Sequence, residues 1–173
     1  MTAPGSLFVV GRINTHNNHT LFKGLLPTMP SRKLIIKRIR QLDPNGCGIA
    51  VVAMAAHVTY WEVRGVLFGL YPGYIAGTSY NDLRRGFDHF KVKYGTRARR
   101  FWSWSAIGHT AVVLIKANYS PGLYHWVILV VRKGSERYVI DPYPTIQGKK
   151  RVDWHKMKGV SFLEFTFKRK RVS

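Results

Sequence analysis

The sequence is poor in acidic residues and has almost no cysteine. Eight Asp and Glu residues stand against 28 Lys and Arg, which gives a formal net charge of +20 over 173 residues. Cys47 is the single cysteine and cannot form an internal disulfide, which favours a reducing compartment and predicts a cytoplasmic protein. No apolar run approaches the roughly 20 residues of a membrane helix, and no basic stretch opens a secretory signal peptide. We therefore expect no membrane segment and no membrane partner.

The same shortages argue against a metal site. Zinc in proteins is held mainly by cysteine, histidine and carboxylate groups. With one cysteine and few acidic residues, His16 and His19 lack the further ligands that a zinc ion would need. We expect no metal and no cofactor.

The apolar content is that of a folded domain in spite of the charge. Hydrophobic residues make up 46% and aromatic residues 13% of the chain, which excludes intrinsic disorder. The length suits one domain with tails. Turn-forming Gly, Pro and Asn crowd the first 30 positions, and a basic run ends the chain. We predict a basic N-terminal arm at 1–30, a domain at 31–167 and a basic C-terminal tail at 168–173.

The basic residues gather in three regions, which are residues 12–40, 84–100 and 149–171. A surface with this charge attracts polyanions and acidic partners, so nucleic acid and acidic proteins are both candidate partners. Affinity for phosphates does not by itself indicate a nucleic-acid function, because counterion release gives any strongly basic protein such affinity.

A turn followed by a buried helix is the clearest local pattern. Asp43-Pro44-Asn45-Gly46 is a strong turn signal, because proline fixes φ and Asn and Gly tolerate positive φ. The ten residues 47–56 are apolar on all sides, which is typical of a buried helix. Before the turn, loose alternation over residues 31–40 predicts a strand.

Further helices are predicted before residue 91, and strands after it. A capping box of Thr59 and Glu62 begins one helix, and Thr78 or Ser79 caps another over residues 81–90. The later segments are rich in Val, Ile and Tyr and are bounded by Gly, Ser and Pro. The predicted extended segments are 97–104, 111–115, 126–131, 137–140 and 161–167, with a hairpin turn at 133–135. Helices followed by an antiparallel sheet predict an α+β domain.

Two residues near the turn have the positions that thiol catalysis needs. A helix N-terminus favours a thiolate nucleophile, and the turn places Cys47 there. Gln41 lies across the turn, where its side-chain amide can donate to an oxyanion beside the backbone N–H of Cys47. We expect Gly46 and Gly48 to leave space for a substrate backbone. Cys47 could also be a small core residue of an apolar helix.

A base and its orienting group are predicted in the sheet. His125 begins the strand 126–131, and Asp141 ends the strand 137–140. The hairpin between these strands brings the two side chains together, so the carboxylate can accept a ring N–H and fix the tautomer of the imidazole. In the ordinary structural interpretation, His125 is a strand-end histidine and Asp141 opens an Asp-Pro turn.

Three stretches of the sequence together carry a family resemblance. They are Gln41-Leu42-Asp43-Pro44-Asn45-Gly46-Cys47-Gly48-Ile49-Ala50 with Ala53-Met54, His125-Trp126-Val127-Ile128-Leu129-Val130, and Tyr138-Val139-Ile140-Asp141-Pro142. They resemble the cysteine, histidine and aspartate motifs of papain-like bacteriocin-processing peptidases. Those are the leader-peptidase domains of bacteriocin-exporting ABC transporters and their stand-alone relatives. The resemblance covers about residues 33–145 and implies a papain-like α+β fold, in which a helical part carrying the cysteine packs on an antiparallel sheet carrying the histidine and aspartate.

The resemblance also implies an activity. It implies a cysteine peptidase, or a related thiol acyl-transfer enzyme, that acts on a peptide or protein. Cys47 would be the nucleophile, His125 the general base and acid, Asp141 the orienting group and Gln41 part of the oxyanion hole. Stand-alone members of this type occur in phages and mobile elements, which would suit a small basic protein of the host cytoplasm. Of the 28 basic residues, 16 lie in residues 1–40 and 149–171, mostly flanking the matched core, so we expect the charge to serve targeting rather than chemistry.

A second hypothesis is a binding protein. It consists of a catalytically inactive papain-like scaffold whose basic arms bind nucleic acid or an acidic protein. Phe101-Trp102-Ser103-Trp104 beside Arg99 and Arg100 could form a base-stacking platform. Strand alternation favours the other interpretation, in which Trp102 and Trp104 lie on one face and pack on the core.

Overall fold

The computed structural model describes residues 36–69, 73, 75–117, 122–132 and 136–167. All of these residues belong to one compact unit, Ile35–Ser173. The predicted arm at 1–30, the tail at 168–173 and the hairpin turn at 133–135 lie outside the described residues. None of the helices in the described part is long and apolar enough to cross a membrane.

Three helices form where the sequence predicts them. They are α1 (Cys47–Ala56), α2 (Tyr60–Phe68) and α3 (Tyr80–His89). Every residue of α1 is buried, as expected for a helix that is apolar on all sides. Capping boxes begin α2 at Thr59 and α3 at Ser79, and α3 starts one residue earlier than predicted.

The strands form one antiparallel sheet. In chain order they are β1 (Lys93–Tyr94), β2 (Arg99–Arg100), β3 (Ala111–Lys116), β4 (Tyr124–Val131), β5 (Arg137–Ile140) and β6 (Gly159–Thr166). Their order across the sheet is β1-β6-β3-β4-β5, and β2 also pairs with β6. A short 3-10 helix, η1 (Trp154–Lys156), precedes β6. The last strand in the chain, β6, therefore lies inside the sheet, while β1 and β5 lie at opposite edges.

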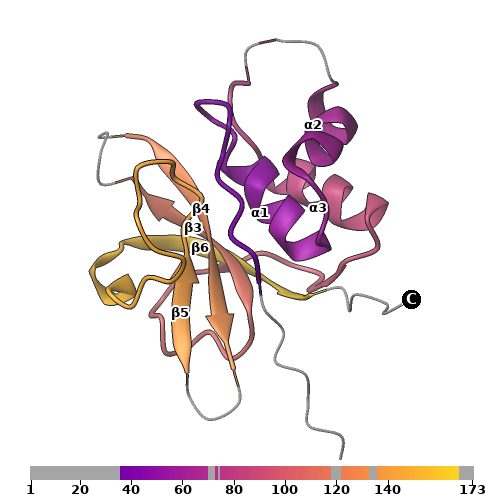
Figure 1. The fold of residues 1–173 in the computed structure, drawn as a ribbon. Coiled ribbons are helices and arrows are strands. Elements are labelled where there is room, and N and C mark those ends of the chain that lie inside the picture. Colours follow the sequence, from indigo (N-terminus) through magenta and orange to yellow (C-terminus); the bar gives the residue numbers. More distant parts are fainter. Residues whose placement is uncertain (1–35, 70–72, 74, 118–121, 133–135, 168–173) are drawn as a thin grey trace, which may run out of the picture. The chain divides into compact units, whose positions relative to one another are not determined.

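The helices gather on one side of the sheet, as Figure 1 shows. Alternate residues of β4 enter two cores because successive side chains of a strand point to opposite faces. Trp126, Ile128 and Val130 pack with α1, whereas Val127 and Leu129 pack with residues of the connections that precede β3 and β6. This arrangement confirms the predicted α+β fold.

The predicted strand at 31–40 is wrong for residues 36–40, which lie outside any strand. Ile36 and Ile39 are partly buried against the helical core, and residues 36–40 pair with none of the strands of the described sheet. It crosses the loop after β5 instead, where the Gln41 N–H donates to the Pro142 carbonyl at 3.0 Å. The alternation of apolar and polar residues here therefore reflects partial burial of the segment and not pairing with a strand.

Candidate active site

Cys47 occupies the first position of α1. The turn before it closes through the Gly46 N–H, which donates to the Asp43 carbonyl at 3.0 Å. Within the described part of the chain, no side chain caps the N-terminus of α1. The N–H groups of the first helical turn have no acceptors within the helix, and they carry the positive end of the helix dipole. These groups are therefore suited to stabilise negative charge on the thiol or on a bound oxyanion.

The two glycines beside Cys47 are required by internal packing. A Cβ atom at Gly46 would overlap with the Tyr60 hydroxyl, and a Cβ atom at Gly48 would overlap with the Thr78 side chain. The prediction that these glycines leave space for a substrate backbone is therefore wrong for the space where their Cβ atoms would lie, because side chains of the protein itself fill that space. The Tyr60 hydroxyl that fills the space beside Gly46 also stabilises the turn, because it donates a hydrogen bond to the Asp43 carboxylate at 2.7 Å.

The structure brings His125 and Asp141 together. The antiparallel pairing of β4 with β5 places the start of one strand beside the end of the other. The His125 Nε2 lies 2.8 Å from the Asp141 Oδ1, and the side chains are only 2% and 4% exposed. The Cys47 side chain is near enough to His125 to be among the causes that raise the pKa of the histidine. Because Nε2 is bonded to Asp141, Nδ1 is the ring nitrogen left for the thiol.

The electrostatics of this cluster favour a charged imidazolium. Burial by itself lowers the pKa of His125, but hydrogen bonds to Asp141 and Cys47 and the attraction of both groups raise the pKa to about 9. Burial by itself raises the pKa of Asp141, but the hydrogen bond and charge of His125, with bonds from the Tyr143 N–H and from Arg151, lower the pKa below its ordinary value. At neutral pH, His125 is therefore protonated and Asp141 is ionised.

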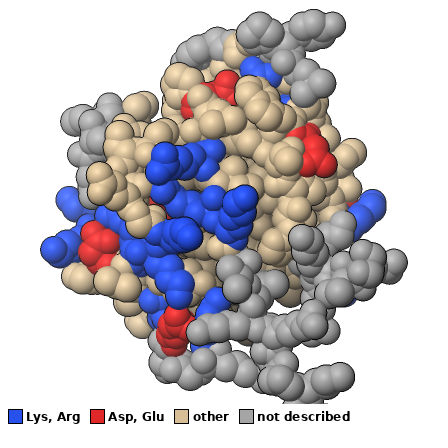
Figure 2. All heavy atoms as spheres, in the orientation of Figure 1, with Lys and Arg blue, Asp and Glu red and all other residues tan. Residues whose placement is uncertain are grey.

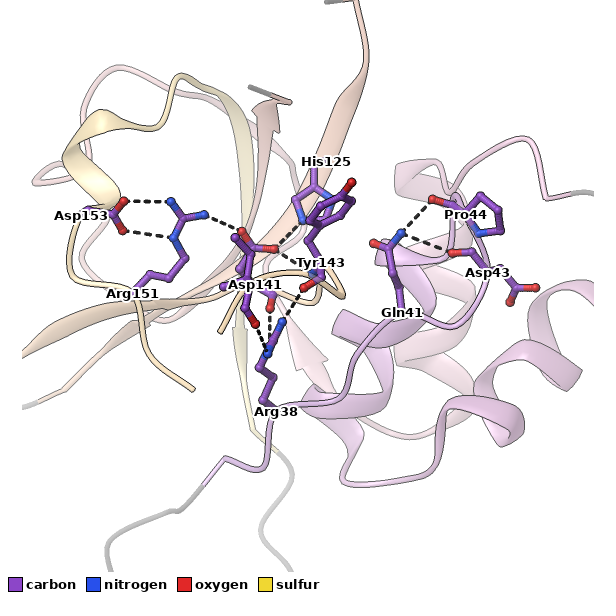
Figure 3. Close-up of polar contacts among 10 residues, drawn as sticks. Arg38, Gln41, Asp43, Pro44, His125, Asp141, Tyr143, Arg151 and Asp153 are labelled. Atoms are coloured by element: carbon purple, nitrogen blue, oxygen red, sulfur yellow. Dashed lines mark hydrogen bonds and ion pairs between the residues drawn. The ribbon is translucent and has the colours of Figure 1, made fainter. Parts of the chain in front are cut away.

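Gln41 lies at the turn, but its NH2 group faces the carbonyls of the turn. Its Nε2 donates to the Pro44 carbonyl at 2.8 Å and to the Asp43 carbonyl at 3.3 Å. Its Oε1 is buried and has no hydrogen-bond partner among the described residues, and Figure 3 shows this oxygen on the side towards His125 and Tyr143. In this orientation the amide holds the turn closed. To donate to an oxyanion it must release one of the two carbonyls.

Arg38 is a site residue that sequence reasoning missed. Its guanidinium donates to three backbone carbonyls of the loop after β5: that of Asp141 at 2.6 Å, that of Tyr143 at 2.5 Å and that of Ile146 at 2.8 Å (Figure 3). These acceptors lie 103 to 108 positions away in the chain. No local pattern marks such a residue, because backbone carbonyls leave no trace in the sequence.

Arg151 is a second residue that was missed. Its backbone forms a bridge with Val139 beside β5, and this bridge places its guanidinium on the far side of Asp141. Nη1 donates to the Asp141 Oδ2 at 2.7 Å, while Nε and Nη2 bind both carboxylate oxygens of Asp153 (Figure 3). Arg151 lies outside the stretch that carries the family resemblance. It contacts Asp141 all the same, so this basic residue belongs to the candidate site.

The aromatic segment after β2 separates into a buried and an exposed tryptophan. Trp104 is 6% exposed and packs in the second core, whereas Trp102 is 77% exposed. The Arg100 guanidinium lies 5.1 Å from the centre of the Trp102 ring. The prediction that both tryptophans pack on the core is wrong for Trp102, because β2 ends at Arg100 and strand alternation does not continue beyond it.

His16 and His19 lie outside the described residues. Within the described ranges, no three His, Cys, Asp or Glu side chains lie close enough together to hold a metal ion.

The fold and this cluster were compared with known proteins. No described protein family and no curated protein matches the sequence. One similar solved structure is a double-glycine motif protease from an AMS/PCAT transporter in complex with the leader peptide. Its TM-score is 0.54, with 18% identity, covering 78% of this chain and 93% of that chain. A second is the peptidase domain of Streptococcus ComA, a bifunctional ABC transporter involved in a quorum sensing pathway, with a TM-score of 0.55 and 13% identity, covering 78% of this chain and 100% of that chain.

These likenesses define the class of fold. The chain has the α+β fold of papain-like cysteine peptidase domains. Within that class it is similar to the peptidase domains of double-glycine, bacteriocin-processing transporters, as the three sequence motifs predicted.

Proposed function

We propose that this protein is a cysteine peptidase, or a related thiol acyl-transfer enzyme, that cleaves a peptide or amide bond. The observation that carries the proposal is the buried cluster of Cys47, His125 and Asp141, in which the imidazole bonds to the carboxylate and the thiol is near enough to help raise the pKa of the imidazole. A positioned base beside a thiol at a helix N-terminus is the arrangement that activates a cysteine nucleophile. The likeness to leader peptidases supports a peptide as the substrate.

In the first half of the reaction, the Cys47 thiolate attacks the carbonyl carbon of the scissile bond. A C–S bond forms, and the electron pair of the C=O bond moves to the oxygen. The N–H groups at the start of α1 stabilise this oxyanion. The His125 imidazolium then gives its Nδ1 proton to the amine as the C–N bond breaks, which leaves a thioester on Cys47.

In the second half, His125 removes a proton from water, which attacks the thioester carbonyl. The C–S bond breaks, the carboxylic product leaves, and the thiolate and imidazolium are restored. An amine in place of water gives acyl transfer by the same steps. Asp141 keeps the imidazole in the orientation that places Nδ1 towards the sulfur.

Gln41 completes the proposed oxyanion hole. Its bond to the Asp43 carbonyl, at 3.3 Å, is the longer and weaker of its two bonds to the turn. We infer that a substrate oxyanion replaces this carbonyl as the acceptor, because a charged acceptor forms the stronger hydrogen bond.

Alkylation of the thiol tests the proposal. The full-length protein should react with iodoacetamide at Cys47 rapidly at pH 7, and His125→Gln should slow the reaction strongly because the imidazolium no longer stabilises the thiolate. Mass spectrometry of the labelled protein measures the rate, and Cys47→Ala is the blank. A rate in the folded protein as slow as that of the His125→Gln variant would show that the cluster does not activate the thiol.

A second candidate function is supported by Trp102 and Arg100. An exposed aromatic face under a guanidinium is suited to stack on bases of single-stranded nucleic acid. The surrounding sequence is also basic, since no acidic residue lies between Asp88 and Glu136.

Fluorescence anisotropy with a labelled single-stranded oligonucleotide tests this candidate. Trp102→Ala should weaken binding about tenfold, the effect of losing one stacked base, while the salt dependence of binding stays unchanged. Trp61→Ala is the matched control, because Trp61 is also exposed (52%) and also lies beside an arginine, Arg64. Equal binding by the two variants would rule out a stacking role for Trp102.

A further inference from the structure

Basic side chains surround the catalytic cluster on two sides. We define the basic rim as six basic residues from two segments, residues 37–40 before α1 and residues 149–151 after β5. Its members are Lys37, Arg38, Arg40, Lys149, Lys150 and Arg151. Figure 2 shows Lys and Arg gathered on this face of the protein, over the segment that leads into α1 and the loops around β5.

The contacts of the rim tie it to the catalytic residues. Arg38 binds the loop that follows Asp141, and Arg151 binds the Asp141 carboxylate. Lys37 and Arg40 lie on either side of Arg38 in the chain. Burial is the largest cause that lowers the pKa of Arg38, and the nearby positive charge of Arg40 lowers this pKa further. The rim therefore includes two of the groups that hold Asp141 and the loop that follows it.

Two carboxylates that contact the rim or lie beside it are already paired. Asp153 is bound by Arg151, and Glu136 is bound by Lys150 and Arg132. In contrast, Lys37, Arg40 and Lys149 are exposed, and none of them forms an ion pair with a carboxylate of the described residues. Three cations at the edge of the site thus remain available to a ligand.

From this arrangement we propose that the substrate is a polypeptide with Asp or Glu residues close to the scissile bond, bound by Lys37, Arg40 and Lys149. The inference rests on the proposed peptidase function and assigns a substrate class to the same site. A single exposed ion pair contributes little to affinity, but a cluster of like charges beside a cleft steers an oppositely charged ligand and raises its association rate. Such selectivity weakens as salt screens the charges.

Cleavage of a proteome-derived peptide library by the full-length protein is the first experiment. Asp and Glu should be enriched at positions flanking the cut, and Lys and Arg should be depleted there. A matched pair of peptides then isolates the charge: one carries the preferred acidic residues, and the other carries Asn and Gln in their place. We expect kcat/KM for the acidic peptide to be about tenfold higher in 50 mM salt, and the ratio to shrink in 300 mM salt.

Charge reversal locates the effect. The triple variant Lys37→Glu, Arg40→Glu, Lys149→Glu should lose the preference for the acidic peptide and retain cleavage of the neutral one. The matched control is Lys91→Glu, Lys93→Glu, Arg97→Glu. These three residues are also exposed but lie in and beside β1, at the opposite edge of the sheet from β5. The control variant should keep the full preference.

The outcomes separate the inference from the proposed function. Efficient cleavage without an acidic preference, or equal loss of preference in both triple variants, overturns the inference and leaves the peptidase proposal standing. No cleavage of any peptide overturns both. A rim that binds a single-stranded oligonucleotide, with no preference among peptides, would instead assign this surface to nucleic acid.

Discussion

Among the proposed catalytic residues, Asp141 is held through both carboxylate oxygens and through its backbone carbonyl. One carboxylate oxygen accepts from His125 Nε2 and from the Tyr143 N–H, and the other accepts from Arg151. Its backbone carbonyl accepts from Arg38. A buried carboxylate is costly unless each of its oxygens is hydrogen-bonded, and here both are. The residue that orients the imidazole is thus itself held in one orientation.

Removing the charge of Asp141 should lower the pKa of His125. The pKa of this histidine stands near 9 because Asp141 and Cys47 outweigh the effect of burial, and Asp141→Asn removes one of these two contributions. In the unsubstituted protein the imidazole should therefore stay protonated up to about pH 9, whereas in the variant it should lose its proton at lower pH. The peptidase rate should fall by about 10²–10⁴.

Titration of the His125 ring signals by NMR measures this change. Asp153→Asn is the control, since it removes a neighbouring carboxylate that does not contact His125. An unchanged His125 titration in Asp141→Asn would contradict the assigned role of the carboxylate.

Arg151 acts on the imidazole through Asp141 and is a positioning residue. Its hydrogen bond is one of the causes that lower the pKa of Asp141. Arg151→Met should therefore raise the pKa of Asp141, and the loss of Cys47 alkylation in acid should begin at higher pH. Arg151→Lys should restore part of the original profile because it keeps the charge. If Arg151→Met lowers the melting temperature but leaves the pH profile unmoved, the arginine has a structural role only.

At the scale of elements, the turn before α1 is held by side chains of α2. Tyr60 and Arg64 both bind the Asp43 carboxylate, and Arg64 is buried. Tyr60 also occupies the space in which a side chain at position 46 would lie. The placement of Cys47 therefore depends on the packing of α1 against α2 as well as on the turn itself.

Gly46→Ala should destabilise the protein by about 1–3 kcal/mol, the usual cost of overpacking. Part of this loss should be recovered by Tyr60→Phe, which removes the hydroxyl that the new methyl group would meet. Urea unfolding of the two single variants and the double variant measures the coupling. Strictly additive losses would show that the Tyr60 hydroxyl is not the obstacle.

The sequence predicted the elements that depend on local patterns. The capping box at Thr59, a helix cap at Thr78 or Ser79, the buried helix from Cys47 and the hairpin that joins His125 to Asp141 all follow from turn residues and periodicity. Arg38, Arg151 and the orientation of the Gln41 amide could not be predicted. The two arginines bind backbone carbonyls and a carboxylate that only the complete fold brings near. The Gln41 amide bonds to carbonyls of its own turn, and neither hydrophobic periodicity nor motif spacing indicates a bond to a backbone carbonyl.

At the scale of the whole molecule, the net charge of +20 opposes compaction. Like charges on a folded surface repel one another, and salt screens this repulsion. Raising the salt concentration from about 20 to 300 mM should therefore raise the melting temperature by about 3 °C or more, which corresponds to roughly 1 kcal/mol for a domain of this size.

Calorimetry in sodium chloride and in sodium acetate of equal ionic strength measures this effect. The two salts should give the same rise, because screening depends on ionic strength and not on the identity of the anion. A fall in the melting temperature would show that attractive ion pairs outweigh the repulsion.

Residues near position 40 bond to the loop after β5, about 100 positions later in the chain, so the site can form only after most of the chain has been synthesised. The thiol enters the chain at position 47, but its base, the orienting carboxylate and the arginine that holds it follow only at positions 125, 141 and 151. The sheet that supports them also requires β6, which lies between β1 and β3. During synthesis a ribosome therefore carries a thiol without its base until most of the chain has been made. With the proposed activity, the protein would be inert towards neighbouring nascent chains until its own fold is complete.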